Sequence, residues 1–280
     1  MIIERVLPVS EPVGTLADYV AIGGGEGLAA ARERGPEWVL GTVAAAGLRE
    51  RSRVGLPAAA TWERESIVIA PGSVRDRFLI GRNPYQVLEG LTIAAFAVGA
   101  SQAVVAVHAG LAWEGGRLYG ALDELCAAGL LGPAPVRMVL EPRSGACDVE
   151  TLAHVPEILR RGPEWFRANE TMVFSVSGNV CRPGVFELPI GISVRLLVEL
   201  AGGGGALAVV SEETGAVLTG AELDLPISVG CGGFVVYDDQ RSSREFSGTA
   251  MSTLVPSPGR ERMVSDPPIS SARSAMLFSP

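Results

Sequence analysis

The stretch Val-Phe-Ser-Val-Ser-Gly-Asn-Val-Cys-Arg-Pro-Gly-Val-Phe-Glu-Leu, at residues 173–188, decides the fold of the second half of this chain. Residues 173–178 alternate largely between apolar and polar side chains, which is typical of a half-buried strand. Arg182, Pro183 and Gly184 are residues that favour a tight turn, and apolar residues return directly after them. The stretch therefore predicts a β-hairpin.

The segments that follow extend this hairpin into a small domain. Residues 193–200 have the spacing of a short amphipathic helix, which the glycines at 202–205 end. Short β-rich runs follow at 207–210 and 234–237. A hairpin, a helix and further strands in this order predict a β-grasp domain over residues 171–238.

The first part of the chain has the pattern of an α/β domain. The β-branched run at 66–70 suits a buried parallel strand. Asn83 then caps a predicted helix that ends at Gly99, and a second apolar strand is predicted at 103–108. Strand, helix and strand in this order are typical of an α/β fold, so residues 1–170 are expected to form such a domain.

The remaining segments carry weaker signals. A further helix is predicted at 118–128 and another from Asp148, whereas residues 133–146 are expected to be irregular. The glycines at 23–27 do not have dinucleotide-fingerprint spacing, so a turn between two helices is the better interpretation. Residues 239–280 are rich in serine and proline and are expected to be a disordered tail.

The composition argues against several classes of protein. The chain carries 23 basic and 31 acidic residues, with no lysine and a net charge of −8, so nucleic-acid binding is not expected. No apolar run approaches the roughly 18 residues that a membrane-spanning helix needs. The N-terminus lacks the basic-then-apolar order of a signal peptide, so the protein is expected to be cytoplasmic. The four cysteines form no CxxC pair, so neither a metal site nor an iron–sulfur cluster is expected.

Residues 47–62, Gly-Leu-Arg-Glu-Arg-Ser-Arg-Val-Gly-Leu-Pro-Ala-Ala-Ala-Thr-Trp, have the frame of a glycine-rich loop for a flavin phosphate. Such a loop needs glycines, so that backbone N–H groups can approach the anion, and a cationic side chain to balance its charge. Here Glu50, Ser52, Arg53 and Ala59 stand where glycine would allow that approach. The run therefore indicates ancestry more clearly than activity.

Together these segments resemble the NADH-binding flavoprotein subunit of respiratory complex I and the related diaphorase subunits of NAD-reducing hydrogenases and formate dehydrogenases. The matching segments are residues 47–62, Asp76-Arg77 with the helix containing Glu89-Gly90, Val149-Glu150-Thr151, residues 174–184 and residues 191–203. The run at 174–184 is the most specific, because it resembles the SLBB (soluble ligand-binding β-grasp) module of that subunit. The resemblance implies a Rossmann-like, FMN-binding-type α/β domain followed by a β-grasp domain.

The resemblance also implies an FMN site, and the chain departs from the family pattern at that site. Thr61 replaces a lysine that assists phosphate binding, and Glu50 adds a negative charge beside the phosphate. Cys147 and Asp148 replace a pair of asparagines. The family's Asn-x-Asp-Glu loop, its Gly-Glu-Glu-Thr segment and its C-terminal iron–sulfur domain have no counterpart, so a degenerate, truncated relative is expected.

Two functions follow as hypotheses. The first is a non-catalytic structural or assembly component of a redox complex, without a cofactor, whose partners include thioredoxin-like or ferredoxin-like iron–sulfur proteins. It is expected in the cytoplasm, either free or peripheral to a membrane complex. The second is a divergent oxidoreductase subunit that binds FMN or a nucleotide and exchanges electrons with a ferredoxin-like partner. Its site residues are Arg49, Arg51, Arg53 and Gly55 in the phosphate loop, with Asp148 beside them. A small-ligand sensor that uses the β-grasp module is a further alternative.

Overall fold

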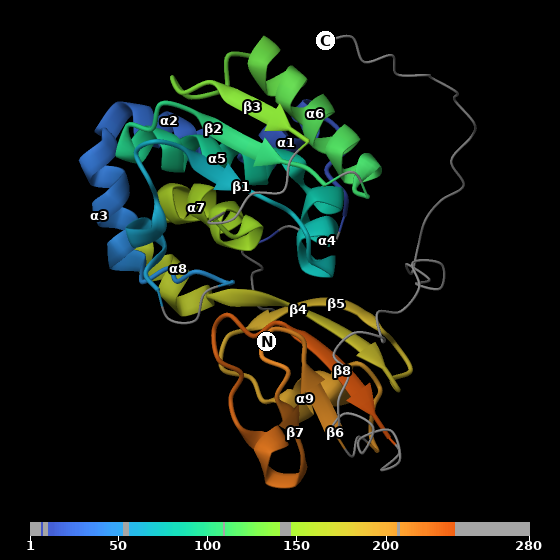
Figure 1. Ribbon diagram of the computed structural model, residues 1–280. Coiled ribbons are helices and arrows are strands. Elements are labelled where there is room, and N and C mark those ends of the chain that lie inside the picture. The colour runs from blue at the N-terminus through green and yellow to red at the C-terminus, as the bar shows by residue number, and fades with distance from the viewer. Residues whose placement is uncertain are drawn as a thin grey trace.

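The computed structural model describes Leu7 and residues 11–52, 56–108, 110–140, 147–205 and 208–238. Figure 1 shows a larger α/β part above a smaller part made mostly of strands. Each part has its own cluster of buried apolar side chains. The predicted α/β and β-grasp fold classes are thus confirmed, whereas the predicted domain boundaries remain predictions. The tail predicted to be disordered lies outside the described residues.

The larger part is built on a parallel sheet of three strands in the order β1-β2-β3. The strands are β1 (Ile67–Ile69), β2 (Ala103–Ala106) and β3 (Val136–Val139), and Ala103 is aligned with both Ile67 and Val136. Strand β2 lies in the centre and all its residues are buried. This is the strand–helix–strand arrangement that the sequence predicts.

Helices surround this sheet and supply most of the larger core. They are α1 (Leu16–Ala21), α2 (Glu26–Arg34), α3 (Pro36–Ala46), α4 (Val74–Arg82), α5 (Pro84–Val98), α6 (Ala112–Ala127), α7 (Val149–Arg161) and α8 (Pro163–Asn169). Helix α5 lies at the centre, because it packs on β1 and β2 and also against α7. Its predicted ends are confirmed: the Asn83 side chain accepts a hydrogen bond from the backbone N–H of Gln86, and Gly99 ends the helix with φ of 65°.

Two sequence-based expectations for the larger part are wrong. Residues 136–139, expected to be irregular, form strand β3, and the helix expected at 118–128 begins at Ala112. Strand β3 lies at the sheet edge, is only four residues long and contains Arg137 between its apolar residues, so its local signal is short. The first turns of α6 contain Gly115 and Gly116, which lower intrinsic helix propensity. In both places tertiary packing outweighs the local sequence.

The predicted turn between the first two helices is confirmed, and a buried carboxylate holds it. Glu89 of α5 accepts hydrogen bonds from the Tyr19 hydroxyl at 2.6 Å and from the backbone N–H of Gly25 at 2.7 Å and Leu28 at 2.9 Å. These N–H groups form the N-terminus of α2, where a negative charge is stabilised by the helix dipole. A side chain of the protein itself therefore occupies the backbone N–H groups at this end of α2.

The smaller part is a five-stranded mixed sheet with one helix. Its elements are β4 (Thr171–Gly178), β5 (Gly184–Pro189), α9 (Val194–Leu200), β6 (Ala208–Ser211), β7 (Val217–Leu218) and β8 (Gly233–Tyr237). The strand order is β5-β4-β8-β6-β7, and the first and last strands, β4 and β8, are parallel neighbours in the centre. The predicted hairpin is the antiparallel pair β4–β5, which aligns Phe174 with Phe186.

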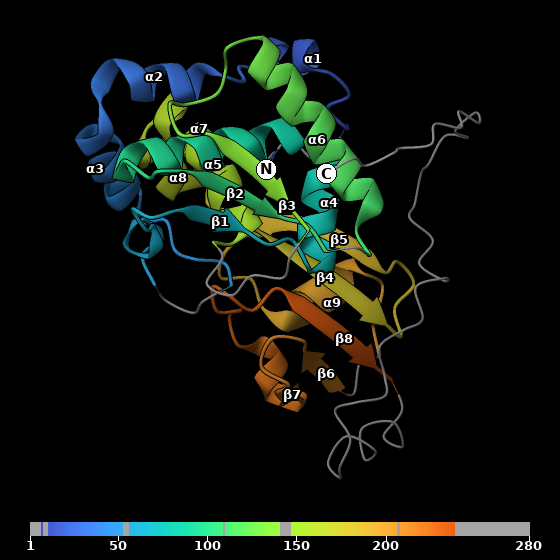
Figure 2. The same cartoon turned by 45° about the horizontal axis from the view of Figure 1, so that its top comes forward.

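The two parts contact one another along α4. Helix α4 packs against β4 and β5, and Figures 1 and 2 both show it above the β-grasp sheet. Among the described residues, no helix is both long enough and apolar enough to cross a membrane.

Candidate functional site: the loop of residues 47–62

In the loop of residues 47–62, the described residues on the two sides of 53–55 pair with each other near the start of α7. Arg49 pairs with Pro57 as an isolated antiparallel bridge, and the backbone N–H of Glu50 donates to the carbonyl of Leu56 at 2.9 Å. The backbone N–H of Ala58 donates to the carbonyl of Leu48 at 2.9 Å. These bonds close the loop and direct the Glu50 side chain into the protein.

The Glu50 carboxylate is buried, with only 1% of the residue exposed. One oxygen accepts a hydrogen bond from the Thr61 hydroxyl at 2.8 Å. The other accepts from the backbone N–H of Asp148 at 3.3 Å and from the Thr151 hydroxyl at 3.4 Å. Asp148 and Thr151 belong to the first turn of α7, so the carboxylate lies at a helix N-terminus, where an anion is favoured.

The predicted site residues that the structure describes lie in different surroundings. Arg49 is exposed, Arg51 is fully buried, and Asp148 is half-buried at the N-cap of α7. Arg53 and Gly55 lie outside the described residues.

Arg51 takes part in the contact between the two parts of the molecule. Its Nη2 donates to the Glu170 carboxylate at 2.8 Å and to the Thr171 carbonyl at 3.2 Å, just where β4 begins. Its backbone N–H donates to the Thr151 hydroxyl at 2.9 Å. A guanidinium with 0% exposure and these partners is not placed to bind a phosphate from solvent.

A buried ion cluster continues this contact towards the β-grasp part. Glu150 lies 3.7 Å from Nε of Arg51 and 3.6 Å from Nη1 of Arg75, and it accepts a 2.8 Å hydrogen bond from the backbone N–H of Val173. Nη2 of Arg75 donates to Glu213 at 2.8 Å. Burial by itself would raise the pKa of Glu150, but His154 and the two arginines hold this pKa below its usual value.

No sequence signal identified this cluster, because its members come from segments far apart in the chain. Gly232 is part of the reason it forms: a Cβ at this position would lie 2.4 Å from Nη1 of Arg75. The glycine leaves room for the guanidinium, and its backbone N–H donates to Glu213 at 3.0 Å. Among the described residues, no group of histidine, cysteine, aspartate and glutamate side chains is arranged to hold a metal ion.

Asp148 makes the stability of this region depend on pH. Burial raises the pKa of its carboxyl to about 8, and the nearby Asp76 and Glu150 add to the effect. The native pKa lies above the unfolded value of about 3.9, so the native state holds a proton that the unfolded chain loses. The contribution of Asp148 to the free energy of unfolding therefore falls as the pH rises from about 4 to about 8.

Asp148→Asn is expected to remove this loss while keeping an oxygen that can cap α7. We expect the free energy of unfolding to rise by roughly 1–2 kcal/mol at pH 8 and to change very little at pH 4. Urea denaturation at both pH values measures this difference. Asp123→Asn, at an exposed position in α6, is the control, and it should change the free energy of unfolding by less than about 0.5 kcal/mol. An equal gain for Asp148→Asn at the two pH values would contradict the expectation.

Comparisons with known proteins agree with this fold. The SLBB domain model matches residues 173–211. The F subunit of the NADH-quinone oxidoreductase of Rhodobacter capsulatus is 30% identical over 68% of this chain and 59% of its own length. The NADP-reducing hydrogenase subunit HndC of Solidesulfovibrio fructosivorans is 25% identical over 80% of this chain and 62% of its own length.

A solved structure supports the fold independently. The NAD+-reducing [NiFe]-hydrogenase in its H2-reduced state matches 81% of this chain and 51% of its own chain, with a TM-score of 0.67 and 24% identity. The chain thus spans little more than half the length of the proteins it matches. Its sequence, its fold and its SLBB module together show that this chain is related to the NADH-quinone oxidoreductase F subunits and to the hydrogenase subunits that resemble them.

Proposed function

We propose that this chain is a non-catalytic structural or assembly component of a redox complex, built on the scaffold of an NADH dehydrogenase flavoprotein subunit. The observation that supports this proposal is the buried Glu50 carboxylate, which accepts hydrogen bonds from Thr61, Asp148 and Thr151. The protein thereby supplies its own anion within the loop that the family resemblance assigns to the flavin phosphate.

The described residues do not fit an FMN phosphate in this loop. A phosphate about 4 Å from an ionised carboxylate would be repelled by roughly 4 kcal/mol at an effective dielectric constant near 20. Arg51, which could offset this repulsion, is buried against Glu170 and Thr171. The loop therefore favours a scaffold role, in which the partners are other subunits of the complex, including thioredoxin-like or ferredoxin-like iron–sulfur proteins.

A flavin titration tests the proposal. The purified protein should be colourless, and FMN fluorescence should show no saturable binding up to about 100 μM, a limit that excludes any Kd typical of a resident cofactor. The double variant Glu50→Gly/Thr61→Lys restores the family residues and should bind FMN measurably more tightly. Glu50→Gln/Thr61→Lys is the matched control, because it removes the carboxylate charge but keeps the side-chain volume.

The outcome that overturns the proposal is a purified wild-type protein with a stoichiometric flavin absorbance spectrum. Such a result would favour the divergent flavin-binding oxidoreductase subunit instead, with Arg49 as an exposed cation among the described residues of the loop. Glu50→Gly/Thr61→Lys separates the scaffold role from the flavin-binding role. Its affinity for FMN should exceed that of the wild-type protein only if Glu50 and Thr61 block the site.

A further inference from the structure

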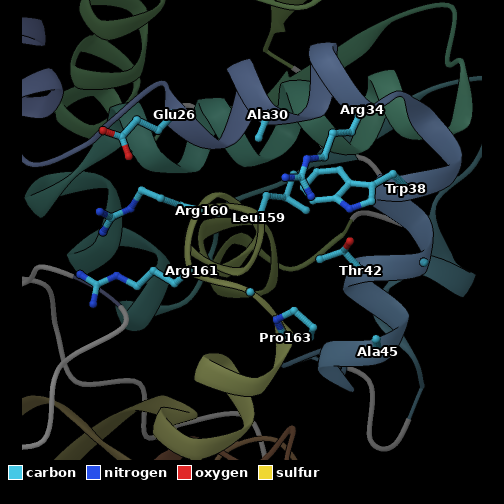
Figure 3. Close-up of a pocket in the computed structure, with 12 residues that line it drawn as sticks. Glu26, Ala30, Arg34, Trp38, Thr42, Ala45, Leu159, Arg160, Arg161 and Pro163 are labelled. Carbon is cyan, nitrogen blue, oxygen red and sulfur yellow. The ribbon is translucent and has the colours of Figure 1, made fainter.

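A groove of about 640 Å³ lies between α2, α3 and the C-terminal end of α7. Leu159, Pro163 and Thr42 form its floor and one side, so much of the lining is apolar (Figure 3). The groove lies at the C-terminal end of α7, whereas the Glu50 contacts described above lie at the N-terminal end of that helix, and the proposed function does not use it.

Three arginines line this groove in a chain whose net charge is −8. Arg34 lies over the ring of Trp38, 4.8 Å from its centre, on one side of the groove. Arg160 and Arg161 extend next to each other on the other side (Figure 3). Arg160 and Arg161 both pair with Glu157, at 2.6 and 2.9 Å, and Glu26 also lines the groove, so three arginines stand against two carboxylates at this place on an acidic protein.

The separation of the cationic sides indicates the shape of the ligand. A small anion could contact only one side, whereas an extended polypeptide with carboxylates on both sides of an apolar residue can contact both sides and the floor. Arginine forks bind carboxylates through paired N–H donors, and such contacts between proteins also favour Trp and Arg anchors.

We propose that this groove, defined by Arg34, Trp38, Leu159, Arg160 and Arg161, binds an acidic, extended segment of a partner polypeptide. The proposal rests on the scaffold role above, since it identifies the surface through which a partner subunit would attach. The segment carries Asp or Glu side chains on both sides of a leucine or aromatic residue, which packs over Leu159.

A defined peptide tests the groove in the full-length protein. The probe is a fluorescein-labelled peptide of sequence Glu-Asp-Leu-Leu-Asp-Glu, and its neutral match is Gln-Asn-Leu-Leu-Asn-Gln. Fluorescence anisotropy should show binding of the acidic peptide at least about tenfold tighter than the neutral one, weakening as salt rises. Arg34→Gln/Arg161→Gln should weaken binding at least about tenfold, which corresponds to the loss of charge-assisted contacts. Arg195→Gln, at an exposed arginine of the β-grasp part, should leave it unchanged.

Several outcomes would overturn the proposal. These are no binding of the acidic peptide, equal binding of the two peptides, equal weakening by Arg195→Gln, or displacement of the peptide by ADP, which would identify a nucleotide site. Because all substituted residues are on the surface, circular dichroism should show unchanged folding. The test does not involve flavin, so its failure is distinguishable from failure of the scaffold proposal, which the flavin titration measures.

Discussion

Gly90→Ala is expected to lower the free energy of unfolding by at least about 3 kcal/mol, one of the largest effects of any single methyl group in this chain. A Cβ at position 90 of α5 would lie only 1.9 Å from the carbonyl oxygen of Leu152 in α7. The obstacle is backbone, so no side-chain rotation can relieve the contact. The two helices would have to separate, and α7 carries both the helix N-terminus that binds Glu50 and the buried Glu150.

Urea denaturation of Gly90→Ala beside Gly120→Ala measures this effect. Gly120 lies within α6 and has no heavy atom within 4 Å of its potential Cβ. The same substitution there should raise stability by up to about 1 kcal/mol, because alanine is the better helix former. Similar effects at the two glycines would show that α5 and α7 are not in the close contact described.

Arg51→Ala is expected to destabilise the protein by about 3–5 kcal/mol, the usual result of removing one partner from a buried ion pair. The substitution leaves Glu150 buried without one of its cations, and removes the 2.8 Å hydrogen bond to Glu170 at the start of β4. The loss should appear in urea or thermal denaturation.

The matched control is Arg49→Ala, an arginine two residues away that is exposed, for which a change below about 1 kcal/mol is expected. The same two variants also separate a structural role from a ligand role. If Arg51→Ala left stability unchanged but weakened the binding of FMN or inorganic phosphate, Arg51 would be a binding residue after all.

The elements predicted best were those whose signals lie within one local segment. Helix α5 has its N-cap, its N-terminal proline and its terminal glycine within the sequence itself, and all three act as expected. The β4–β5 hairpin was likewise identified by alternation and a Pro-Gly turn. Strand β3 was missed because a short, half-buried edge strand is defined by the partner it pairs with, not by its own composition.

The candidate site was predictable only in part. The sequence placed Glu50 and Thr61 in a loop that resembles a phosphate site, but did not show that Thr61 donates to Glu50 at 2.8 Å. It also suggested Arg51 as a phosphate donor, whereas the structure places this guanidinium beside Glu170, more than a hundred residues away in the chain. Arg75 and Glu213, which connect the two parts, carried no recognisable motif.

By itself, the sequence determined the two folds and the relationship to the flavoprotein subunits, and it predicted that Glu50 and Thr61 stand where the family pattern has glycine and lysine. Local signals are enough for these, because periodicity, turns and caps act over a few residues. Only the tertiary structure decided what the replaced residues do. Whether a carboxylate repels a phosphate at the surface or is buried at the start of α7 depends on which distant groups donate hydrogen bonds to it. In the structure, Thr61, Asp148 and Thr151 donate hydrogen bonds to the Glu50 carboxylate, and Arg51 takes part in the contact between the α/β and β-grasp parts.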